Sequence, residues 1–135
     1  MEFLKILKDR GLKATPQRVA VLKELGKKTH PTMDEIYSGI RVENPTISLA
    51  TVYKNVNLLK EQGIVIEINI PSGKMRYDYL SHPHIHLVCK NCGCIEDLDY
   101  DENLFNFQNS LEKNRNIVID RLDVIASLES CSFCK

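Results

Sequence analysis

Four of the five cysteines stand in two pairs with the same spacing. Cys89 and Cys92 form one Cys-x-x-Cys pair, and Cys131 and Cys134 form the other. Each pair can present two thiolates to one ion, and four thiolates in a tetrahedron select zinc and close its coordination. The sequence therefore predicts a structural zinc that ties the end of the chain to its middle. A redox-active dithiol is the alternative, and Cys94 is left over as a free thiol.

Two histidines upstream of the first pair face one side of a predicted strand. His84 and His86 are two residues apart, so their side chains point to the same face. Asp78 precedes them and Asp97 follows them, and both can supply carboxylate oxygen. Imidazole and carboxylate without sulfur suit Fe(II), Mn(II) or Zn(II), and fewer than six ligands leave a position open to a small molecule. These four residues predict a second metal site, whereas spacing alone does not connect His30 with it.

The first 79 residues predict four helices, most of them marked by a cap. Thr15 followed by Pro16 begins the second helix, because a proline at the first helical position loses no hydrogen bond. Thr32 and Glu35 have capping-box spacing and begin the third helix. Ser48 caps the fourth helix, which leaves a polar face free to enter a groove. Its opposite, buried face is predicted to consist of Leu49, Val52, Val56 and Leu59.

Alternating residues after the fourth helix predict a β-hairpin. The period of two is typical of a half-buried strand, and one face holds Ile64, Ile66, Ile68 and Ile70. The Pro-Ser-Gly-Lys sequence at residues 71–74 predicts a turn into a second strand over residues 75–79. Three helices, a polar-faced fourth helix and a basic-tipped hairpin together describe a winged helix-turn-helix.

The balance of charge changes sign around residues 80–83, where we place a hinge. Residues 1–79 hold 13 Lys and Arg against 9 Asp and Glu, and residues 80–135 hold 5 against 9. The basic part suits a surface that meets phosphate, although ordinary solvated surface can also account for the split. Beyond the hinge, we expect strands over 84–89 and 95–98, a helix over 101–113 and a long strand over 117–128. The predicted fold class is α+β, with an N-terminal winged helix-turn-helix domain (1–79) and a small C-terminal α/β domain (84–135).

The distribution of apolar residues is unlike that of a membrane protein or a secreted protein. No stretch approaches the roughly 20 apolar residues of a membrane span. Residues 1–12 alternate charged and apolar residues, unlike the unbroken apolar run of a signal peptide. We therefore expect a soluble cytoplasmic protein without a membrane partner, whose cysteines stay reduced. With 135 residues, two small modules completed by dimerisation fit best.

A series of short motifs resembles the ferric-uptake-regulator family in order and spacing. It comprises Lys-Ala-Thr-Pro-Gln-Arg at 13–18, His-Pro-Thr at 30–32, the helix at 48–55 and Arg-Tyr-Asp at 76–78. A His-x-His-x-x-Cys-x-x-Cys-Gly-x-x-x-Asp segment follows at 84–97, and Cys-x-x-Cys at 131–134 ends the match. Any one motif is weak, whereas the ordered series covers nearly the whole chain and is highly specific.

This resemblance implies a homodimer with two kinds of metal site, joined through its C-terminal domains. The structural zinc would bind the four paired cysteines. The regulatory Fe(II) or Mn(II) site would be formed by His30, Asp78, His84, His86 and Asp97, of which His30 enters by resemblance alone. Filling that site would favour one angle between the domains, and so set the spacing of two recognition helices on a palindromic DNA operator. Such a protein is a transcriptional repressor and not an enzyme.

The same resemblance assigns DNA contacts to the N-terminal domain. Tyr53 would pack on thymine methyl groups, Lys54 would donate to guanine or phosphate, and Lys13 would reach the minor groove or backbone. Tyr53 can also be a half-buried packing residue, and Arg18 can be either a phosphate contact or a surface charge. The full set of candidate DNA-binding residues is Lys13, Arg18, Ser48, Thr51, Tyr53, Lys54 and Asn55.

Two aspartates favour the peroxide-sensing branch of that family. Members that sense iron typically have glutamate where this chain has Asp78 and Asp97, whereas the peroxide sensors have aspartate at both positions. In those sensors, Fe(II) and hydrogen peroxide oxidise a ligand imidazole, and the operator is released. The matching oxidation-sensitive residues here are His30 and His84. Mn(II) would support repression without this sensitivity.

Three alternatives stay open. Cys94 and His82 are potential extra ligands, so an iron-responsive or zinc-responsive member of the family is the first alternative. A small thiol-disulfide enzyme is the second, although its motif usually lies at a helix N-terminus, unlike the strand-turn-strand setting predicted around Cys89. A zinc-stabilised protein-interaction module is the third, and the polar face of the helix that begins at Ser48 argues against it.

Overall fold

The computed structural model of the protein describes residues 2–27, 29–70, 73–79, 84–119, 121–132 and 134. The chain divides into two units, Met1–Leu80 and Ser81–Lys135, and each has a sheet of its own. The predicted hinge at 80–83, which includes His82, lies outside the described residues, as do Pro71 and Ser72 of the predicted turn. In the part of the chain that is described, no helix has both the length and the apolar character needed to cross a membrane.

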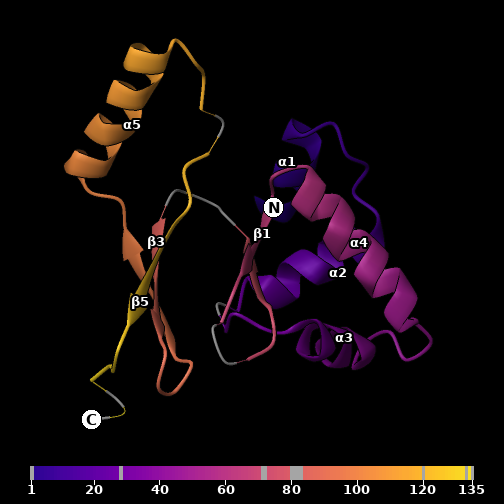
Figure 1. Ribbon diagram of the computed structural model, residues 1–135. Helices are drawn as coiled ribbons and strands as arrows, with labels where there is room; N and C mark the ends of the chain where they lie inside the picture. Colours follow the sequence, from indigo (N-terminus) through magenta and orange to yellow (C-terminus); the bar gives the residue numbers. More distant parts are fainter. Residues whose placement is uncertain are drawn as a thin grey trace. The chain divides into compact units, whose positions relative to one another are not determined.

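Four helices open the N-terminal unit, and three of them start at the expected caps. The helices are α1 (Glu2–Asp9), α2 (Pro16–Leu25), α3 (Met33–Arg41) and α4 (Leu49–Glu61) (Figure 1). The side chains of Thr15 and Ser48 each accept the backbone N–H three residues further on, and Thr32 forms a complete capping box with Glu35. Each cap satisfies N–H groups that have no partner within the helix, so the chain turns into helix at these positions.

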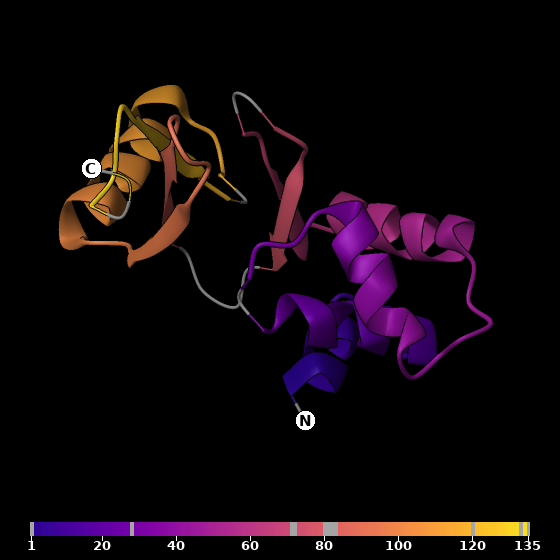
Figure 2. The ribbon, with the colours of Figure 1, turned by 90° about the horizontal axis from the view of Figure 1, so that it is seen from below.

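One hydrophobic core joins these helices to a two-stranded wing. In the wing, β1 (Val65–Ile68) pairs antiparallel with β2 (Arg76–Tyr79) (Figure 2). The predicted buried face of α4 is correct for Val52, Val56 and Leu59, which are buried in the core. It is wrong for Leu49, which is 43% exposed, because this first residue of α4 lies beyond the core cluster.

The first wing strand is half-buried as the alternation predicted, since Ile66 and Ile68 are buried and Glu67 is exposed, and Val65 is the one exception. Val65 pairs with Tyr79, and both belong to the core cluster, although the alternation placed Val65 on the polar face. Ile66 and Ile68 lie on the other face and are buried as well. Asp78 shares that second face, because it is the register partner of Ile66. The wing therefore holds a buried carboxylate among apolar side chains.

A three-stranded sheet and one helix make up the C-terminal unit. The strands β3 (His84–Cys89), β4 (Ile95–Asp99) and β5 (Val124–Leu128) have the order β4-β3-β5. The central strand β3 pairs antiparallel with β4 and parallel with β5. Helix α5 (Glu102–Arg115) follows β4 and is capped by Asp101. Helices and sheets together confirm the predicted α+β composition of the fold.

The last strand is shorter than the sequence predicted. Alternation suggested a strand over 117–128, whereas β5 covers only Val124–Leu128. Asn116 ends α5 with a left-handed φ of 53°, and the N–H of Ile119 donates to the Glu112 carboxylate at 3.0 Å. The segment after α5 thus engages the end of the helix instead of a neighbouring strand.

Candidate metal centres and nucleic-acid interface

The four paired cysteines meet at one point of the C-terminal unit. Cys89 ends β3 and Cys92 lies in the turn after it, while Cys131 and Cys134 follow β5. The sulfur atoms of Cys89 and Cys134 are 3.5 Å apart, as are those of Cys92 and Cys131, and all four lie within 4.8 Å of one another. Zinc with Zn–S bonds of about 2.3 Å needs sulfur separations of about 3.8 Å in a tetrahedron. The geometry therefore fits a structural zinc.

Backbone N–H groups favour the thiolate form of two of these cysteines. The N–H of Cys92 lowers the pKa of Cys89, and the N–H of Cys131 lowers the pKa of Cys134 to about 6. An N–H from Cys94 also lowers the pKa of Cys92, but the hydrogen bond with Cys131 and burial outweigh it and raise that pKa to about 12. Clustered thiols do not all ionise together unless a cation balances them, and a zinc ion would supply that charge.

The setting of the cysteines argues against a dithiol enzyme. The first pair begins at the last residue of β3, the second pair follows β5, and neither stands at a helix N-terminus, where the helix dipole would lower the pKa of a thiol. Cys94 lies outside the four-sulfur cluster, and its carbonyl accepts the N–H of Cys89 at 2.9 Å, which closes the turn. All five cysteines are free thiols. A closed metal site explains this convergence better than thiol-disulfide exchange.

The N-terminal unit brings His30 and Asp78 together. Nε2 of His30 lies 3.8 Å from Oδ2 of Asp78, and both residues are buried. Asp78 belongs to β2, and His30 lies in the segment between α2 and α3. This segment runs beside β2, because the N–H of Tyr77 donates to the carbonyl of Pro31 at 2.9 Å. That pairing joins distant parts of the sequence, which is why spacing could not connect His30 with Asp78.

The C-terminal unit brings together the other three predicted ligands. His84 and His86 share one face of β3, and their Nε2 atoms are 2.9 Å apart. Asp97 stands opposite His86 on β4. Its Oδ1 lies 3.4 Å from Nε2 of His86 and 3.8 Å from Nε2 of His84. Imidazole and carboxylate donors that converge without sulfur suit Fe(II), Mn(II) or Zn(II).

Candidate DNA-binding residues on α4 differ in how free their side chains are. Tyr53, which is 52% exposed, and Lys54 are exposed on the helix. Ser48 accepts the N–H of Thr51 at 3.1 Å, and Asn55 donates to the carbonyl of Thr51 at 2.8 Å. The hydroxyls of Ser48 and Thr51 are also hydrogen-bonded to each other at 2.9 Å, so all three side chains are engaged by the helix itself. Tyr53 and Lys54 are thus the better placed to contact bases.

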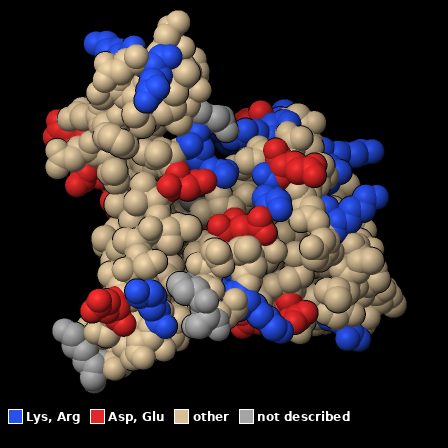
Figure 3. Space-filling view, in the orientation of Figure 1, with Lys and Arg blue, Asp and Glu red and all other residues tan. Residues whose placement is uncertain are grey.

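Lys13 is exposed in the loop before α2, and Arg18 is tied to that loop. Nη1 of Arg18 donates to the carbonyl of Lys13 at 2.8 Å, while Nε of Arg18 is buried without a hydrogen-bond partner. The guanidinium therefore fixes the main chain that carries Lys13. Further Lys and Arg side chains project around α1 and α4 of this unit (Figure 3). This surface has the charge that a phosphate backbone requires.

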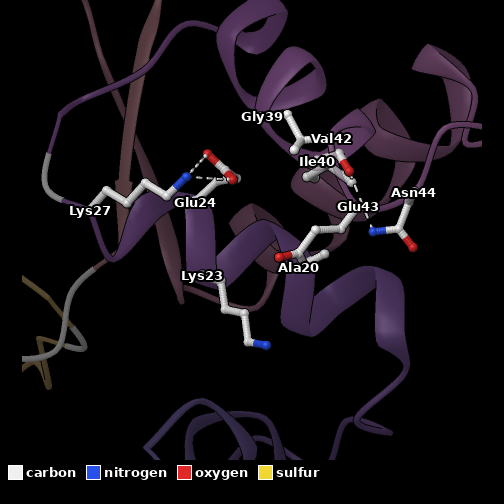
Figure 4. A pocket seen from close by; sticks show the side chains of 9 residues that line it. All are labelled: Ala20, Lys23, Glu24, Lys27, Gly39, Ile40, Val42, Glu43 and Asn44. Carbon is white, nitrogen blue, oxygen red and sulfur yellow. Dashed lines mark hydrogen bonds and ion pairs between the residues drawn. The ribbon is translucent and has the colours of Figure 1, made fainter.

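A surface pocket of about 260 Å³ lies between α2 and the end of α3 (Figure 4). Glu24 and Lys27 line it and form an ion pair at 2.9 Å. Gly39 faces Glu24, and a Cβ at this position would collide with the carboxylate. The lining includes none of the residues predicted to bind metal or DNA. The pocket is therefore separate from the candidate sites.

Comparison with known proteins places the chain in a family. The family model described as the ferric uptake regulator family matches residues 9–126. The chain belongs to the ferric uptake regulator family. It is 40% identical over 102 residues to the peroxide-responsive repressor PerR of Staphylococcus aureus (strain Mu50 / ATCC 700699), which is 75% of this chain and 69% of that protein.

Solved structures resemble this chain over nearly its whole length. The crystal structure of the Campylobacter jejuni peroxide stress regulator is 50% identical, with a TM-score of 0.82, and covers 99% of this chain and 100% of that one. The Helicobacter pylori ferric uptake regulator, whose structure is described as revealing three functional metal binding sites, is 26% identical with a TM-score of 0.71. That match covers 96% of this chain and 87% of the Helicobacter chain.

The relatives settle the fold class of this chain. They have an N-terminal winged-helix domain and a C-terminal dimerisation domain, as the sequence predicted. Members of the family are transcriptional regulators and not enzymes, which also agrees with the prediction. Sequence reasoning missed Arg76, whose Nη1 donates to the carbonyl of His30 at 3.1 Å. Residue type alone gives no signal for such a main-chain contact.

Proposed function

We propose that this chain is a cytoplasmic, metal-dependent repressor that binds palindromic operator DNA as a homodimer and senses hydrogen peroxide. Its similarity to proteins named as a peroxide-responsive repressor and a peroxide stress regulator supports this function. One observation carries the proposal furthest, namely that both histidine–carboxylate groups contain aspartate. Asp78 lies beside His30, and Asp97 lies beside His84 and His86.

The proposed metals divide between two donor sets. Zinc would occupy the four-sulfur cluster as a structural ion. The two histidine–carboxylate groups hold two and three donors, which are few for one ion each, so we propose that both groups bind the same Fe(II) or Mn(II). The proposed ligands are His30, Asp78, His84, His86 and Asp97. A bound metal would favour one arrangement of the two units, by its differential affinity for that arrangement.

The proposed dimer interface belongs to the C-terminal unit. No residue of α5 is buried, although Phe105 and Phe107 of this helix are apolar and are 48% and 54% exposed. Val118, shortly after α5, is 92% exposed. Large apolar side chains that are exposed on an uncovered helix are typical of an interaction surface, and a second copy of the chain provides a surface of the same chemistry. Dimerisation would also place two α4 helices on two half-sites.

The proposed DNA contacts are of two kinds: some read the base sequence, and others position the protein on the DNA backbone. Tyr53 and Lys54 on α4 would reach base edges in the major groove. Lys13, on the loop that Arg18 fixes, would contact the minor groove or the backbone. The N-terminal unit carries the excess of Lys and Arg in this chain, which is consistent with a role in phosphate binding.

Peroxide sensing would end in oxidation of a ligand histidine. Fe(II), when bound, supplies the redox chemistry by which hydrogen peroxide oxidises a neighbouring imidazole, and Mn(II) does not do so readily. One oxygen atom of the peroxide is added to the ring of His30 or His84, and the other leaves as water. An oxidised ring is a poor ligand, so the DNA-binding arrangement of the units loses its support.

The proposal is tested on a DNA duplex selected from random sequence by the Mn(II)-loaded protein. We expect specific binding to require metal at fixed salt, and peroxide to release the Fe(II) form but not the Mn(II) form from the duplex. Equal affinity with and without a chelator would contradict metal control. Binding that follows the iron or zinc concentration without any response to peroxide would favour an iron-responsive or zinc-responsive member of the family.

A further inference from the structure

His30 has a backbone conformation that its own sequence disfavours. Its φ is 50°, in the left-handed region, and Asn116 at the end of α5 is the only other described non-glycine residue with a positive φ. His30 also precedes Pro31, and a proline pushes the residue before it toward extended backbone. A left-handed non-glycine residue persists only where the surrounding structure holds it in place. Contacts with the surrounding structure must therefore fix His30.

Two consecutive residues of β2 supply such contacts. Nη1 of Arg76 donates to the carbonyl of His30 at 3.1 Å. The N–H of Tyr77 donates to the carbonyl of Pro31 at 2.9 Å. The strained residue and its neighbour are thus bound through successive carbonyls to the wing. Of the two donors, only the Arg76 guanidinium is a side chain that substitution can remove.

Arg76 is itself held by an acidic partner. Oε1 of Glu35 lies 3.5 Å from Nη1 of Arg76 and accepts the N–H of Thr32 at 2.9 Å. The Thr32 N–H lowers the pKa of Glu35, and the charge of Arg76 adds to this effect, so the carboxylate stays ionised near neutral pH. The capping box at the start of α3 therefore presents a fixed negative charge to the guanidinium.

Arg76 and Asp78 act on His30 from one face of the same strand. Residues two apart on a strand share a face, so β2 presents a guanidinium to the His30 main chain and a carboxylate to its ring. A change in the His30 backbone torsions swings the imidazole away from Asp78. We propose that Arg76 is a positioning residue, which holds the left-handed backbone that keeps the His30 imidazole beside Asp78. This inference rests on the proposed function in one respect, that His30 is a metal ligand.

The test measures the affinity for Mn(II) alone by electron paramagnetic resonance. Arg76→Met removes the donors and keeps an aliphatic side chain, and we expect a fall in Mn(II) affinity of about 10- to 100-fold, as for other residues that orient a ligand. Arg76→Lys retains one donor group and should recover part of the loss. The matched control is Lys74→Met, since Lys74 pairs with Asp34 at 3.1 Å in the same region. This control should leave the affinity within about twofold.

A double-mutant cycle separates positioning from a general loss of stability. On a His30→Ala background, Arg76→Met should no longer change Mn(II) affinity, because the side chain that it positions is gone. An equal fall on both backgrounds, or no fall in Arg76→Met alone, would overturn the proposal. Unchanged Mn(II) affinity in His30→Ala alone would instead refute the proposed function of this site.

A readout without metal tests the backbone directly. The ¹³Cα chemical shift of His30 reports its backbone conformation, and in the metal-free protein it should change in Arg76→Met but not in Lys74→Met. An unchanged shift in a folded Arg76→Met protein would also overturn the proposal. If Arg76→Met does not fold, Arg76→Lys takes its place in both measurements, with a smaller change expected in the same direction.

Discussion

The sulfur atoms of Cys92 and Cys131 lie 3.5 Å apart, although these residues are 39 positions apart in the sequence. Parallel pairing of β3 with β5 explains this, because parallel strands end at the same side of a sheet. The turn after β3 and the segment after β5 are therefore neighbours. A zinc ion bound there would contribute its binding free energy to the folded state, on the order of 10–16 kcal/mol for structural zinc in small peptides.

Removing one of these sulfurs should cost both the zinc and the dimer. We expect Cys131→Ser to lose zinc, measured with a colorimetric chelator, and to sediment as a monomer, because the segment after β5 is no longer tied to the sheet. Cys94→Ser is the matched control, since Cys94 lies outside the four-sulfur cluster and should keep both properties. A stable dimer of Cys131→Ser without zinc would show that the dimer does not depend on this ion.

Substitutions of two exposed residues in the N-terminal unit should affect DNA binding differently, one by lowering its sequence specificity and the other by lowering its overall affinity. Tyr53→Ala should cost about 1–3 kcal/mol in discrimination between the operator and unrelated DNA, because a base contact is lost. Lys13→Ala should weaken binding to all sequences and reduce the salt slope by about one unit. Fluorescence anisotropy at several salt concentrations measures both, with Lys113→Ala on α5 as the control. Equal losses on operator and unrelated DNA in Tyr53→Ala would exclude a base-reading role.

Arg18 should act on DNA through Lys13. Arg18→Gln removes the hydrogen bond to the Lys13 carbonyl and should lower the free energy of unfolding by about 1 kcal/mol. Operator affinity should fall about as far as in Lys13→Ala, and the double variant should be little worse than either single variant. Additive losses in this cycle would mean that Arg18 contacts phosphate independently.

Local signals predicted the helices well. The caps at Thr15, Thr32 and Ser48 form as expected, because a cap involves side chains and N–H groups only three residues apart. The pairing of the cysteines was also predictable, because the turn within a Cys-x-x-Cys motif by itself brings the two sulfur atoms close together. These features depend little on the rest of the fold.

Features that depend on distant contacts were harder to predict. Alternation placed Val65 on a polar face, but the packing of the helices buries it. Alternation also extended the last strand back to residue 117, where Ile119 instead donates to Glu112. The left-handed backbone of His30 and its contact with Arg76 gave no sequence signal, because they arise from pairing between distant segments.

Asp97 should control the response to peroxide. Its Oδ1 lies 3.4 Å from His86 and 3.8 Å from His84, so a shift of this carboxylate changes how the donors are arranged. Asp97→Glu keeps the charge and adds one methylene group, and we expect metal-dependent DNA binding to remain while the reaction with peroxide is altered or lost. Asp123→Glu makes the same chemical change at an exposed residue paired with Arg121 and should leave the response intact.

The site of oxidation identifies the mechanism. Wild-type protein loaded with Fe(II) and given stoichiometric peroxide should gain one oxygen atom on the peptide containing His30 or His84 and then release DNA. The same treatment after Mn(II) loading should leave both peptides unmodified and the DNA bound. Peptide mass spectrometry distinguishes this from thiol chemistry, which would place oxygen or a disulfide on the cysteine peptides instead. If DNA release followed cysteine oxidation with both histidines intact, the protein would still respond to peroxide, but the histidine mechanism would be wrong.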